Sequence, residues 1–207
     1  MELKQYAPEE IEKKSFEIIE AELNRKLDKE QEPVIKRVIH TTADFSYAEN
    51  LCFSGQAIKR AKEALKNGAC IVTDTNMGKA GINKKALARY GGEVYCFMAD
   101  EDVAAEAKKR NTTRAAVSME KAAKLHKKCI YAIGNAPTAL IRLYELIQEE
   151  SVQPELVIGV PVGFVNVVES KELILELDVP HIVARGRKGG SNLAAAICNA
   201  MLYQIAR

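Results

Sequence analysis

The sequence has no tryptophan, only three histidines, and no apolar run that approaches the roughly 20 residues of a membrane-spanning helix. Its five cysteines are widely spaced without a C-x-x-C pair, so we expect neither a disulfide framework nor a thiolate zinc site. With 30 basic and 28 acidic residues, the net charge of +2 is too small to predict binding to nucleic acid or to an anionic membrane. The first residues, MELKQYAPEE, lack a basic start followed by an apolar core, so we expect no signal peptide and a cytoplasmic location.

The rest of the composition is that of one globular domain. Of the 207 residues, 47% are hydrophobic, which is enough to bury a sizeable core. The chain has no internal repeat and no linker rich in glycine, proline or serine. We therefore expect a single domain over residues 1–207, with a mainly helical segment over residues 1–68 and alternating strands and helices over residues 69–207.

Three helices are expected in the first segment. Pro8, followed by two glutamates, is a favourable helix start, and apolar residues then recur at three- and four-residue steps. A second helical pattern runs from Val34 to His40. Ser54 is the expected cap of a third helix, which ends at an Asn-Gly stop signal.

Five short apolar runs in the second segment predict buried strands. They are continuous rather than alternating and rich in β-branched or aromatic residues, which is typical of a parallel sheet covered on both faces. The runs are residues 69–73, 94–98, 129–133, 156–160 and 181–184. Helical patterns separate them, around residues 83–90, 101–126, 137–150, 166–177 and 191–205. This alternation predicts an α/β fold with a doubly wound, five-stranded parallel sheet.

Ligands of open parallel sheets bind beyond the carboxyl ends of the strands, so the segments after each strand are candidate binding loops. Two of them, residues 134–138 and 185–191, are rich in glycine and lead directly into a helix. Exposed amides at a helix start, with the three cations of the second loop, suit an anion. Each loop by itself is equally well explained as a tight connection.

Neither G-x-G-x-x-G nor G-x-x-x-x-G-K-[ST] occurs, so these loops do not match a known nucleotide cradle. A polycarboxylate suits the scattered cations better, because arginine pairs with a carboxylate through two hydrogen bonds. No histidine spacing predicts a metal site, and no G-x-S-x-G elbow predicts a hydrolase.

His40 is the candidate acid. It stands near the end of the second expected helix, where helix carbonyls favour the protonated imidazole, and two threonines and an aspartate follow it. The alternative is a surface or capping histidine without a catalytic role. His126 is expected to be a solvated helix residue, and His181 is expected to be structural.

Several long segments resemble the precorrin-8X and cobalt-precorrin-8 methylmutases. They are RVIHTTADF (37–45), IGNAPTAL (133–140), VPVGFVNVVESK (160–171) and RGRKGGSNLAAAICNAM (185–201), with SFEIIEAE (15–22) and TDTNMGKAGI (73–82) in support. The resemblance implies an isomerase of cobalamin biosynthesis that moves a methyl group between neighbouring carbons of a tetrapyrrole ring, formally a 1,5-sigmatropic shift. It also implies a flavodoxin-like fold and a homodimer whose active sites lie near the interface.

The family's catalytic histidine falls on His40, and two substrate-binding positions fall on Ser15 and Arg37. The three-residue spacing predicts that Arg37 and His40 share one helix face. Chemistry alone suggests further contacts to the substrate's carboxylate arms, at Thr41, Thr42, Asn135, Thr138, Arg185, Arg187, Lys188 and Ser191, and through the amides of residues 134–138. No protein-bound cofactor or metal is expected, because cobalt, if present, belongs to the substrate.

Two other functions fit the same pattern. One is a non-catalytic tetrapyrrole carrier, which would bind the pigment without converting it. The other is a flavodoxin-like electron carrier, which is disfavoured because no loop after a strand is rich in serine and threonine and because tryptophan is absent. The HTTADF segment is typical of family members that act on cobalt-precorrin-8, which favours that substrate.

Overall fold

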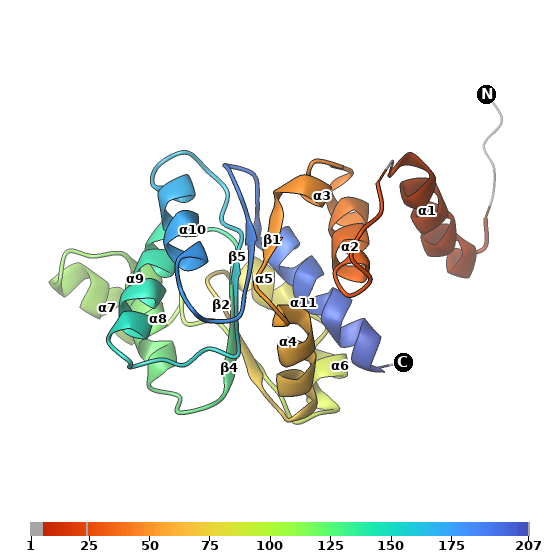
Figure 1. Ribbon diagram of the computed structural model, residues 1–207. Coiled ribbons are helices and arrows are strands. Elements are labelled where there is room, and N and C mark those ends of the chain that lie inside the picture. Colours follow the sequence, from red (N-terminus) through yellow and green to blue (C-terminus); the bar gives the residue numbers. More distant parts are fainter. Residues whose placement is uncertain (1–5, 24, 207) are drawn as a thin grey trace.

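The computed structural model describes residues 6–23 and 25–206, and one mixed β-sheet forms its centre (Figure 1). The sheet has six strands in the order β1-β6-β5-β4-β2-β3. Their bounds are Leu51–Phe53 (β1), Cys70–Thr73 (β2), Val94–Tyr95 (β3), Cys129–Ile133 (β4), Leu156–Gly159 (β5) and His181–Ala184 (β6). The five strands expected from the sequence are present and parallel. No signal peptide is expected in the N-terminal segment. Its residues 1–5 lie outside the described residues.

The strand β1 corrects the expectation of a five-stranded, entirely parallel sheet. It pairs antiparallel with β6, and Leu51 lies opposite Ala184 while Phe53 lies opposite Ile182. The sheet is therefore mixed and has six strands. Three residues are too few to form a recognisable strand pattern, and the pairing partner of β1 lies near the other end of the chain. Only the tertiary structure creates this edge strand.

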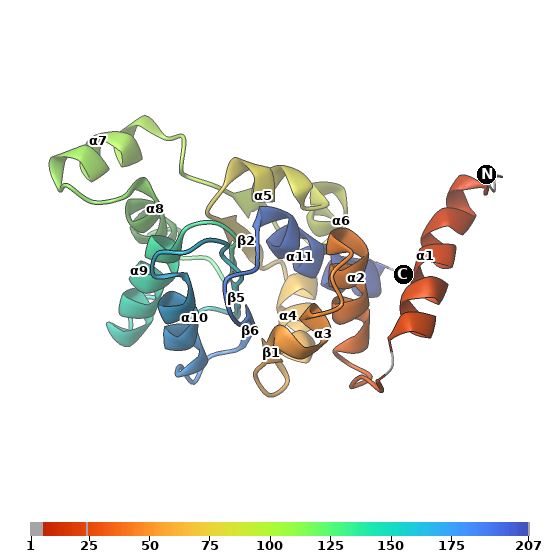
Figure 2. The same ribbon diagram turned by 90° about the horizontal axis from the view of Figure 1, so that it is seen from above.

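Helices cover both faces of the sheet (Figures 1 and 2). The described residues contain α1 (Pro8–Glu22), α2 (Glu32–Thr42), α3 (Tyr47–Asn50), α4 (Ala57–Lys66), α5 (Asn76–Gly81), α6 (Lys84–Ala88), α7 (Glu101–Lys109), α8 (Arg114–Ala123), α9 (Pro137–Gln148), α10 (Val167–Leu175) and α11 (Ser191–Ala206). On one face α8, α9 and α10 pack together, and on the other α11 packs with α2 and α4. The sheet is thus a middle layer between two helical layers.

Alternating side chains of each central strand build two separate cores. In β4, Ile130 and Ala132 join the core on the α11 side, whereas Tyr131 and Ile133 join the core on the α9 side. All five residues of β4 are buried. This arrangement explains the continuous apolar runs, because a strand covered on both faces cannot show a polar side.

The helix expected over residues 101–126 is two helices, and His126, expected to be a solvated helix residue, lies beyond α8 in a left-handed conformation. α7 ends at Lys109, Asn111 then takes a left-handed conformation with φ of 50°, and α8 begins after Thr113. The Thr113 hydroxyl accepts a hydrogen bond from the N–H of Ala116, as a helix cap does. Asparagine after one helix and threonine before the next are local stop and start signals that the apolar periodicity concealed.

Two further local expectations are corrected. Ser54 does not cap α4, because its hydroxyl accepts from the N–H of His181 at 2.8 Å and so anchors the start of β6. The residue before α4 is Gln56, in a left-handed conformation. The segment after β2, expected as a loop, forms the short helix α5, capped by the Thr75 hydroxyl.

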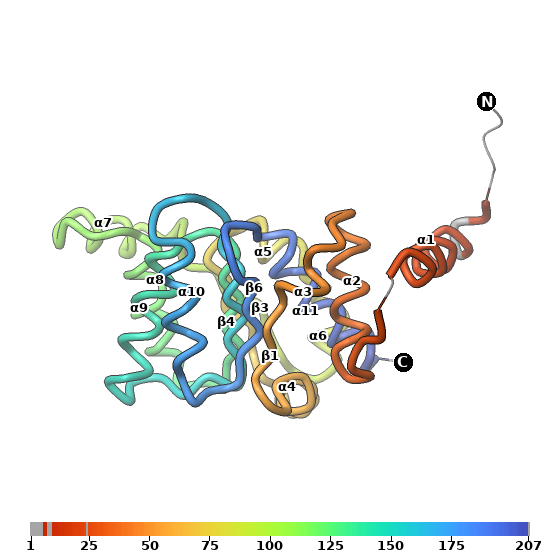
Figure 3. The backbone as a smooth tube through the Cα atoms, turned by 45° about the horizontal axis from the view of Figure 1, so that its top comes forward, coloured from red at the N-terminus to blue at the C-terminus, as the bar shows by residue number. Residues whose placement is uncertain are grey.

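The helix α1 lies at the margin of the molecule and packs mainly against α2 (Figure 3). All three views show it at one end of the molecule, away from the sheet. Among the described residues, no helix combines the length and apolar character required to cross a membrane.

Candidate functional site

The loops at the carboxyl ends of the parallel strands are joined to one another by specific contacts. The N–H of Gly190, after β6, donates to the carbonyl of Val160, after β5, at 2.9 Å. The hydroxyls of Thr75, after β2, and Ser191 are 2.7 Å apart. At Gly134, after β4, a Cβ would lie 2.6 Å from the Cα of Ser191, so only glycine permits this approach. The loops after β2, β4, β5 and β6 therefore meet at one edge of the sheet.

The backbone amides after β4 are not free for a substrate. The buried carboxylate of Asp74 accepts hydrogen bonds from the N–H groups of Gly134, Asn135 and Ala136 at 2.9, 2.8 and 2.6 Å. Burial raises the pKa of Asp74, while the three amides oppose that shift by stabilising the carboxylate. This corrects the expectation that these amides bind the substrate, because the anion they hold is part of the protein.

Two candidate side chains at this edge also have protein partners. Thr138, in the first turn of α9, accepts a hydrogen bond from the Thr113 hydroxyl at 2.9 Å. Ser191 is paired with Thr75, as described above. The side chain of Asn135 is exposed beside them. Of these three, Asn135 is the most accessible to a ligand.

The catalytic candidate lies on α2, next to this edge. His40 is exposed in the last turn of α2, and its ring centroid is 5.3 Å from that of Phe16 in α1. The guanidinium of Arg37 lies 4.9 Å from the centroid of the same Phe16 ring. Arg37 and His40 therefore face α1 together, as their spacing predicted. Sequence reasoning missed Phe16, although it directly follows Ser15.

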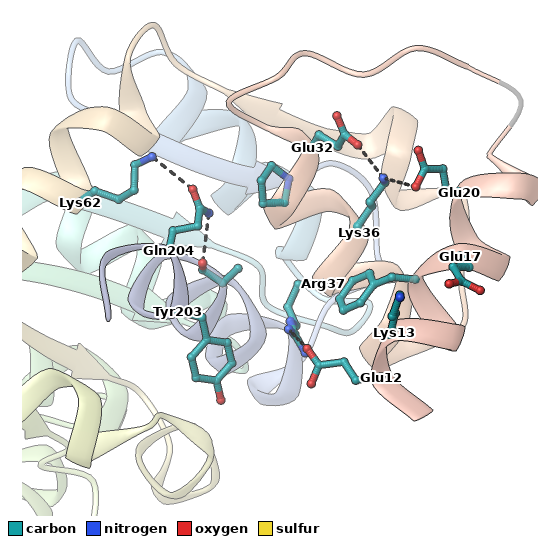
Figure 4. A pocket seen from close by; sticks show the side chains of 13 residues that line it. Glu12, Lys13, Glu17, Glu20, Glu32, Lys36, Arg37, Lys62, Tyr203 and Gln204 are labelled. Atoms are coloured by element: carbon teal, nitrogen blue, oxygen red, sulfur yellow. Dashed lines mark hydrogen bonds and ion pairs between the residues drawn. The ribbon is translucent and has the colours of Figure 1, made fainter. Parts of the chain in front are cut away.

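Arg37 is enclosed by further partners. Its Nη2 is 2.6 Å from Oε1 of Glu12, and its guanidinium lies 5.3 Å from the centroid of Tyr203 (Figure 4). Only 15% of the Arg37 side chain is exposed, against 49% for Glu12. The arginine expected to bind a substrate carboxylate is thus held between two rings and already paired with a carboxylate of the protein.

The hydroxyls around His40 are used within their own helices. Thr41 donates to the carbonyl of Arg37 at 2.9 Å, and Thr42 donates to that of Val38 at 2.8 Å. Ser15 donates to the carbonyl of Ile11 at 2.9 Å. These hydroxyls keep acceptor capacity, but their hydrogens are engaged in this structure.

The cationic loop after β6 reaches the end of α2. Nζ of Lys188 is 2.6 Å from Oδ2 of Asp44 and 3.1 Å from the Ser46 hydroxyl. Lys188 lowers the pKa of Asp44, chiefly through this hydrogen bond. Since Asp44 lies just beyond the helix that carries His40, this ion pair joins the two groups of candidate residues.

The other two cations of the loop are exposed. Arg185 lies 3.4 Å from Glu172 of α10. The guanidinium of Arg187 lies 5.5 Å from the ring of Phe164, a phenylalanine with 81% of its surface exposed. An exposed aromatic ring beside a cation offers both an apolar surface and a charge to a ligand.

A pocket of about 1030 Å³ lies between α1, α2 and α11, beside the candidate residues of α2 (Figure 4). It includes Arg37 and Phe16 but not His40. Its charged lining is balanced, with four acids and four bases: Glu12, Glu17, Glu20, Glu32, Lys13, Lys36, Arg37 and Lys62. A balanced lining does not select a polycarboxylate, so the sheet edge with its three cations suits such a ligand better.

Two buried ionisable residues at the edge were missed from the sequence. Asp74 directly follows a buried strand, which was an available signal. Lys171 lies on the apolar face of α10, four residues after Val167 and three before Ile174, and is fully buried. Its ammonium donates to main-chain carbonyls of the loop after β6. His181 is structural as expected, since its Nδ1 lies 3.0 Å from the carbonyl of Val179 and burial lowers its pKa.

Comparison with known proteins identifies the family. A family model described as precorrin-8X methylmutase matches residues 10–204. A cobalt-precorrin-8 methylmutase of Priestia megaterium is 47% identical, over 94% of this chain and 87% of the relative. A precorrin-8X methylmutase of Pseudomonas aeruginosa is 37% identical, over 92% of this chain and 93% of the relative. The crystal structure of a precorrin-8X methyl mutase from Thermus thermophilus superposes with a TM-score of 0.87 at 38% identity, covering 95% of this chain and 97% of that one. The chain belongs to the precorrin-8X methylmutase family.

Proposed function

We propose that this protein is an isomerase of cobalamin biosynthesis that converts cobalt-precorrin-8 into cobyrinate. Family membership over residues 10–204 is the observation that carries this conclusion. Relatives named for cobalt-precorrin-8 reach 47% and 46% identity, whereas two named for precorrin-8X are 37% and 34% identical. Those identities and the HTTADF segment favour the cobalt-containing substrate over precorrin-8X, which would give hydrogenobyrinate.

The reaction moves one methyl group between neighbouring ring carbons. One carbon–methyl bond breaks, one forms, and substrate and product are isomers, so no electrons enter or leave the ring. We therefore propose that the protein needs no redox partner and no cofactor of its own. Any cobalt arrives within the substrate.

His40 is the proposed catalytic residue, which donates or holds a proton at a ring nitrogen. Its exposure on α2 leaves the imidazole open to a ligand. The Phe16 ring, whose centroid is 5.3 Å from that of His40, restricts the orientation of the imidazole. A positioned acid with a fixed orientation is what a proton-assisted rearrangement of a bound ring requires.

The carboxylate arms of the substrate are the proposed partners of the cations. Arg37 faces the same side of α2 as His40, while Arg185 and Arg187 extend from the loop after β6. Exposed Phe164 and Val165, in the loop after β5, offer the ring an apolar surface beside Arg187. The remaining polar candidates are proposed as weaker contacts to the substrate: Ser15, Thr41, Thr42, Asn135, Thr138, Lys188 and Ser191.

We also propose that the protein acts in the cytoplasm as a homodimer with the active site near the interface. The helix α1, which carries Phe16, packs mainly against α2 and leaves Ile11 54% and Ile18 48% exposed. A second copy would cover these side chains. Sedimentation at micromolar and lower concentrations should give the mass of two chains.

The proposed relation to the flavodoxin-like fold depends on strand order. The parallel strands follow the order β3-β2-β4-β5-β6, which in chain order is 2-1-3-4-5. That is the order of the flavodoxin-like doubly wound sheets, to which β1 adds an antiparallel edge. In such sheets ligands bind beyond the carboxyl ends, where the loops described above converge.

Conversion of the substrate tests this function directly. Purified protein should convert cobalt-precorrin-8 into cobyrinate, followed by the change in absorbance. His40→Ala should lower turnover by roughly 10²-fold or more, the usual contribution of a general acid, while much of the product affinity remains. His126→Asn is the matched control, because it removes an exposed imidazole at a left-handed position that asparagine tolerates.

Three results would separate the alternatives. Binding of the ring without conversion by the native protein would favour a tetrapyrrole carrier. Turnover by His40→Ala within twofold of the native value would remove this histidine from the mechanism. Equal losses in His40→Ala and His126→Asn would point to a general effect of the substitutions.

A further inference from the structure

Lys171, in α10, is fully buried, although lysine is among the residues least often found inside proteins. Its Nζ donates to the carbonyl of Gly186 at 2.6 Å and to that of Lys188 at 2.9 Å. Both carbonyls belong to the loop between β6 and α11. One buried side chain therefore fixes this cationic loop at two points.

Packing alone does not explain a lysine at this position. Desolvation lowers the pKa of Lys171 to about 8, which shows that burying its charge is unfavourable. Methionine has a similar length, fills irregular space and needs no hydrogen bonds, and apolar replacements of buried charges are often neutral or stabilising. The lysine supplies two hydrogen-bond donors that methionine lacks.

The loop that Lys171 holds is also tied to the loop after β5. The N–H of Gly190 donates to the carbonyl of Val160 at 2.9 Å, and the N–H of Gly163 donates to the carbonyl of Arg187 at 3.2 Å. Together with the two donors of Lys171, these bonds restrain the backbone on either side of Arg187 and Lys188. The directions of both side chains follow from that restraint.

These directions matter for the site. The guanidinium of Arg187 lies over the exposed ring of Phe164, and the ammonium of Lys188 binds Asp44, four residues after His40. A series of contacts thus runs from Lys171, through the backbone and side chain of Lys188, to the end of the helix that carries His40.

We propose that Lys171 is a positioning residue for the methyl shift, which directs Arg187 toward the substrate's carboxylate arms and keeps Lys188 on Asp44 beside the helix of His40. This inference rests on the proposed function of the same site. Lys171 does not touch the substrate. Its effect on the reaction passes through the backbone of residues 186–188.

The test compares Lys171→Met and Lys171→Gln with the native protein. We expect Lys171→Met to stay folded, with a Tm near the native value, and to lose roughly ten- to hundredfold in kcat/KM, the range that a misplaced site produces. The loss should be divided between a higher KM, from the displaced Arg187, and a lower kcat, from the loosened end of α2. Lys171→Gln keeps a donor and should lie between the two.

Hydrogen exchange provides a second measurement that does not depend on activity. Amides of residues 185–190 and 43–46 should exchange faster in Lys171→Met than in the native protein. Lys121→Met is the control, because Lys121, in α8, pairs with Asp100 and Asp102 and not with the loops after β5 and β6, so its loss should change neither the kinetics nor these amides.

The outcomes separate this inference from the proposed function. Lys171→Met with native kcat/KM and native exchange would overturn the positioning role. Failure of both variants to fold would assign Lys171 to stability and would equally overturn it. If the native protein does not convert cobalt-precorrin-8, the proposed function fails, and unchanged exchange of residues 185–190 would still refute the restraint by Lys171.

Discussion

Single residues at this site are already paired within the protein. Arg37, which is expected to bind a substrate carboxylate, holds the carboxylate of Glu12 at 2.6 Å, and Phe16 and Tyr203 flank its guanidinium. A carboxylate arm of the substrate must therefore compete with Glu12. Because about half of the Glu12 side chain is exposed, this ion pair is expected to be weak and displaceable.

Replacement of Glu12 should relieve this competition. In Glu12→Gln, product affinity should rise and KM should fall by up to about fivefold, the range that a partly exposed ion pair of about 1 kcal/mol allows. Titration of the protein with cobyrinate measures this effect. Glu17→Gln is the control, since Glu17 lines the same pocket but pairs with Lys14. Weaker binding by Glu12→Gln would mean that Glu12 orients Arg37 rather than competing for it.

At the scale of elements, the loops after β2 and β4 depend on one buried carboxylate. Asp74 binds three successive amides in the segment that leads into α9, which gives these donors an acceptor within the protein. The segment after β4 does bind an anion, as its sequence suggested, but that anion is the carboxylate of Asp74 in the loop after β2. This contact keeps two strand ends of the site together.

Asp74→Asn tests that role. A side-chain amide offers one oxygen in place of two, so at least one buried N–H loses its acceptor, and the free energy of unfolding should fall by about 2–3 kcal/mol. Urea unfolding measures the change. Asp102→Asn is the control, because 68% of that side chain is exposed and its replacement should leave the free energy of unfolding close to that of the native protein. Equal stability of the two variants would contradict the role given to Asp74.

At the scale of the whole molecule, the two-sided core determines how the protein responds to alkaline conditions. Burial raises the pKa of the Cys129 and Cys198 thiols to about 12 from an ordinary value of 9.0. Above pH 9 the unfolded chain releases these protons while the folded chain keeps them, so stability is lost as the pH rises from 9 toward 12. Lys171 acts in the opposite direction between pH 8 and 10.5, because its folded pKa is lowered.

The thiol contribution can be isolated in one variant. Between pH 9 and 10.5, Cys198→Ala should lose less stability than the native protein, by up to about 1.4 kcal/mol per pH unit, because one buried titrating group is gone. Urea unfolding under reducing conditions at several pH values gives both slopes. Parallel slopes for the two proteins would show that the Cys198 thiol does not contribute to the pH dependence of stability. This comparison holds even if the substitution lowers the free energy of unfolding at pH 8.

Local patterns in the sequence predicted most of the framework. The five parallel strands follow from short continuous apolar runs, and the helices between them and the shared face of Arg37 and His40 follow from the helical period of 3.6 residues. Both signals depend only on nearby residues. The long segments shared with the methylmutases predicted the family, which the comparisons confirm.

Contacts between distant segments were decided only by the tertiary structure. The pairing of β1 with β6, the capture of three amides by Asp74, the burial of Lys171 under the loop after β6 and the ion pair of Arg37 with Glu12 each join residues far apart in the chain. No spacing rule encodes such partners, because the loss of chain entropy on closing long loops is compensated by the packing of the whole domain. Composition and periodicity thus determined the layers of this protein, and packing of the layers determined which charged groups remain available for a ligand.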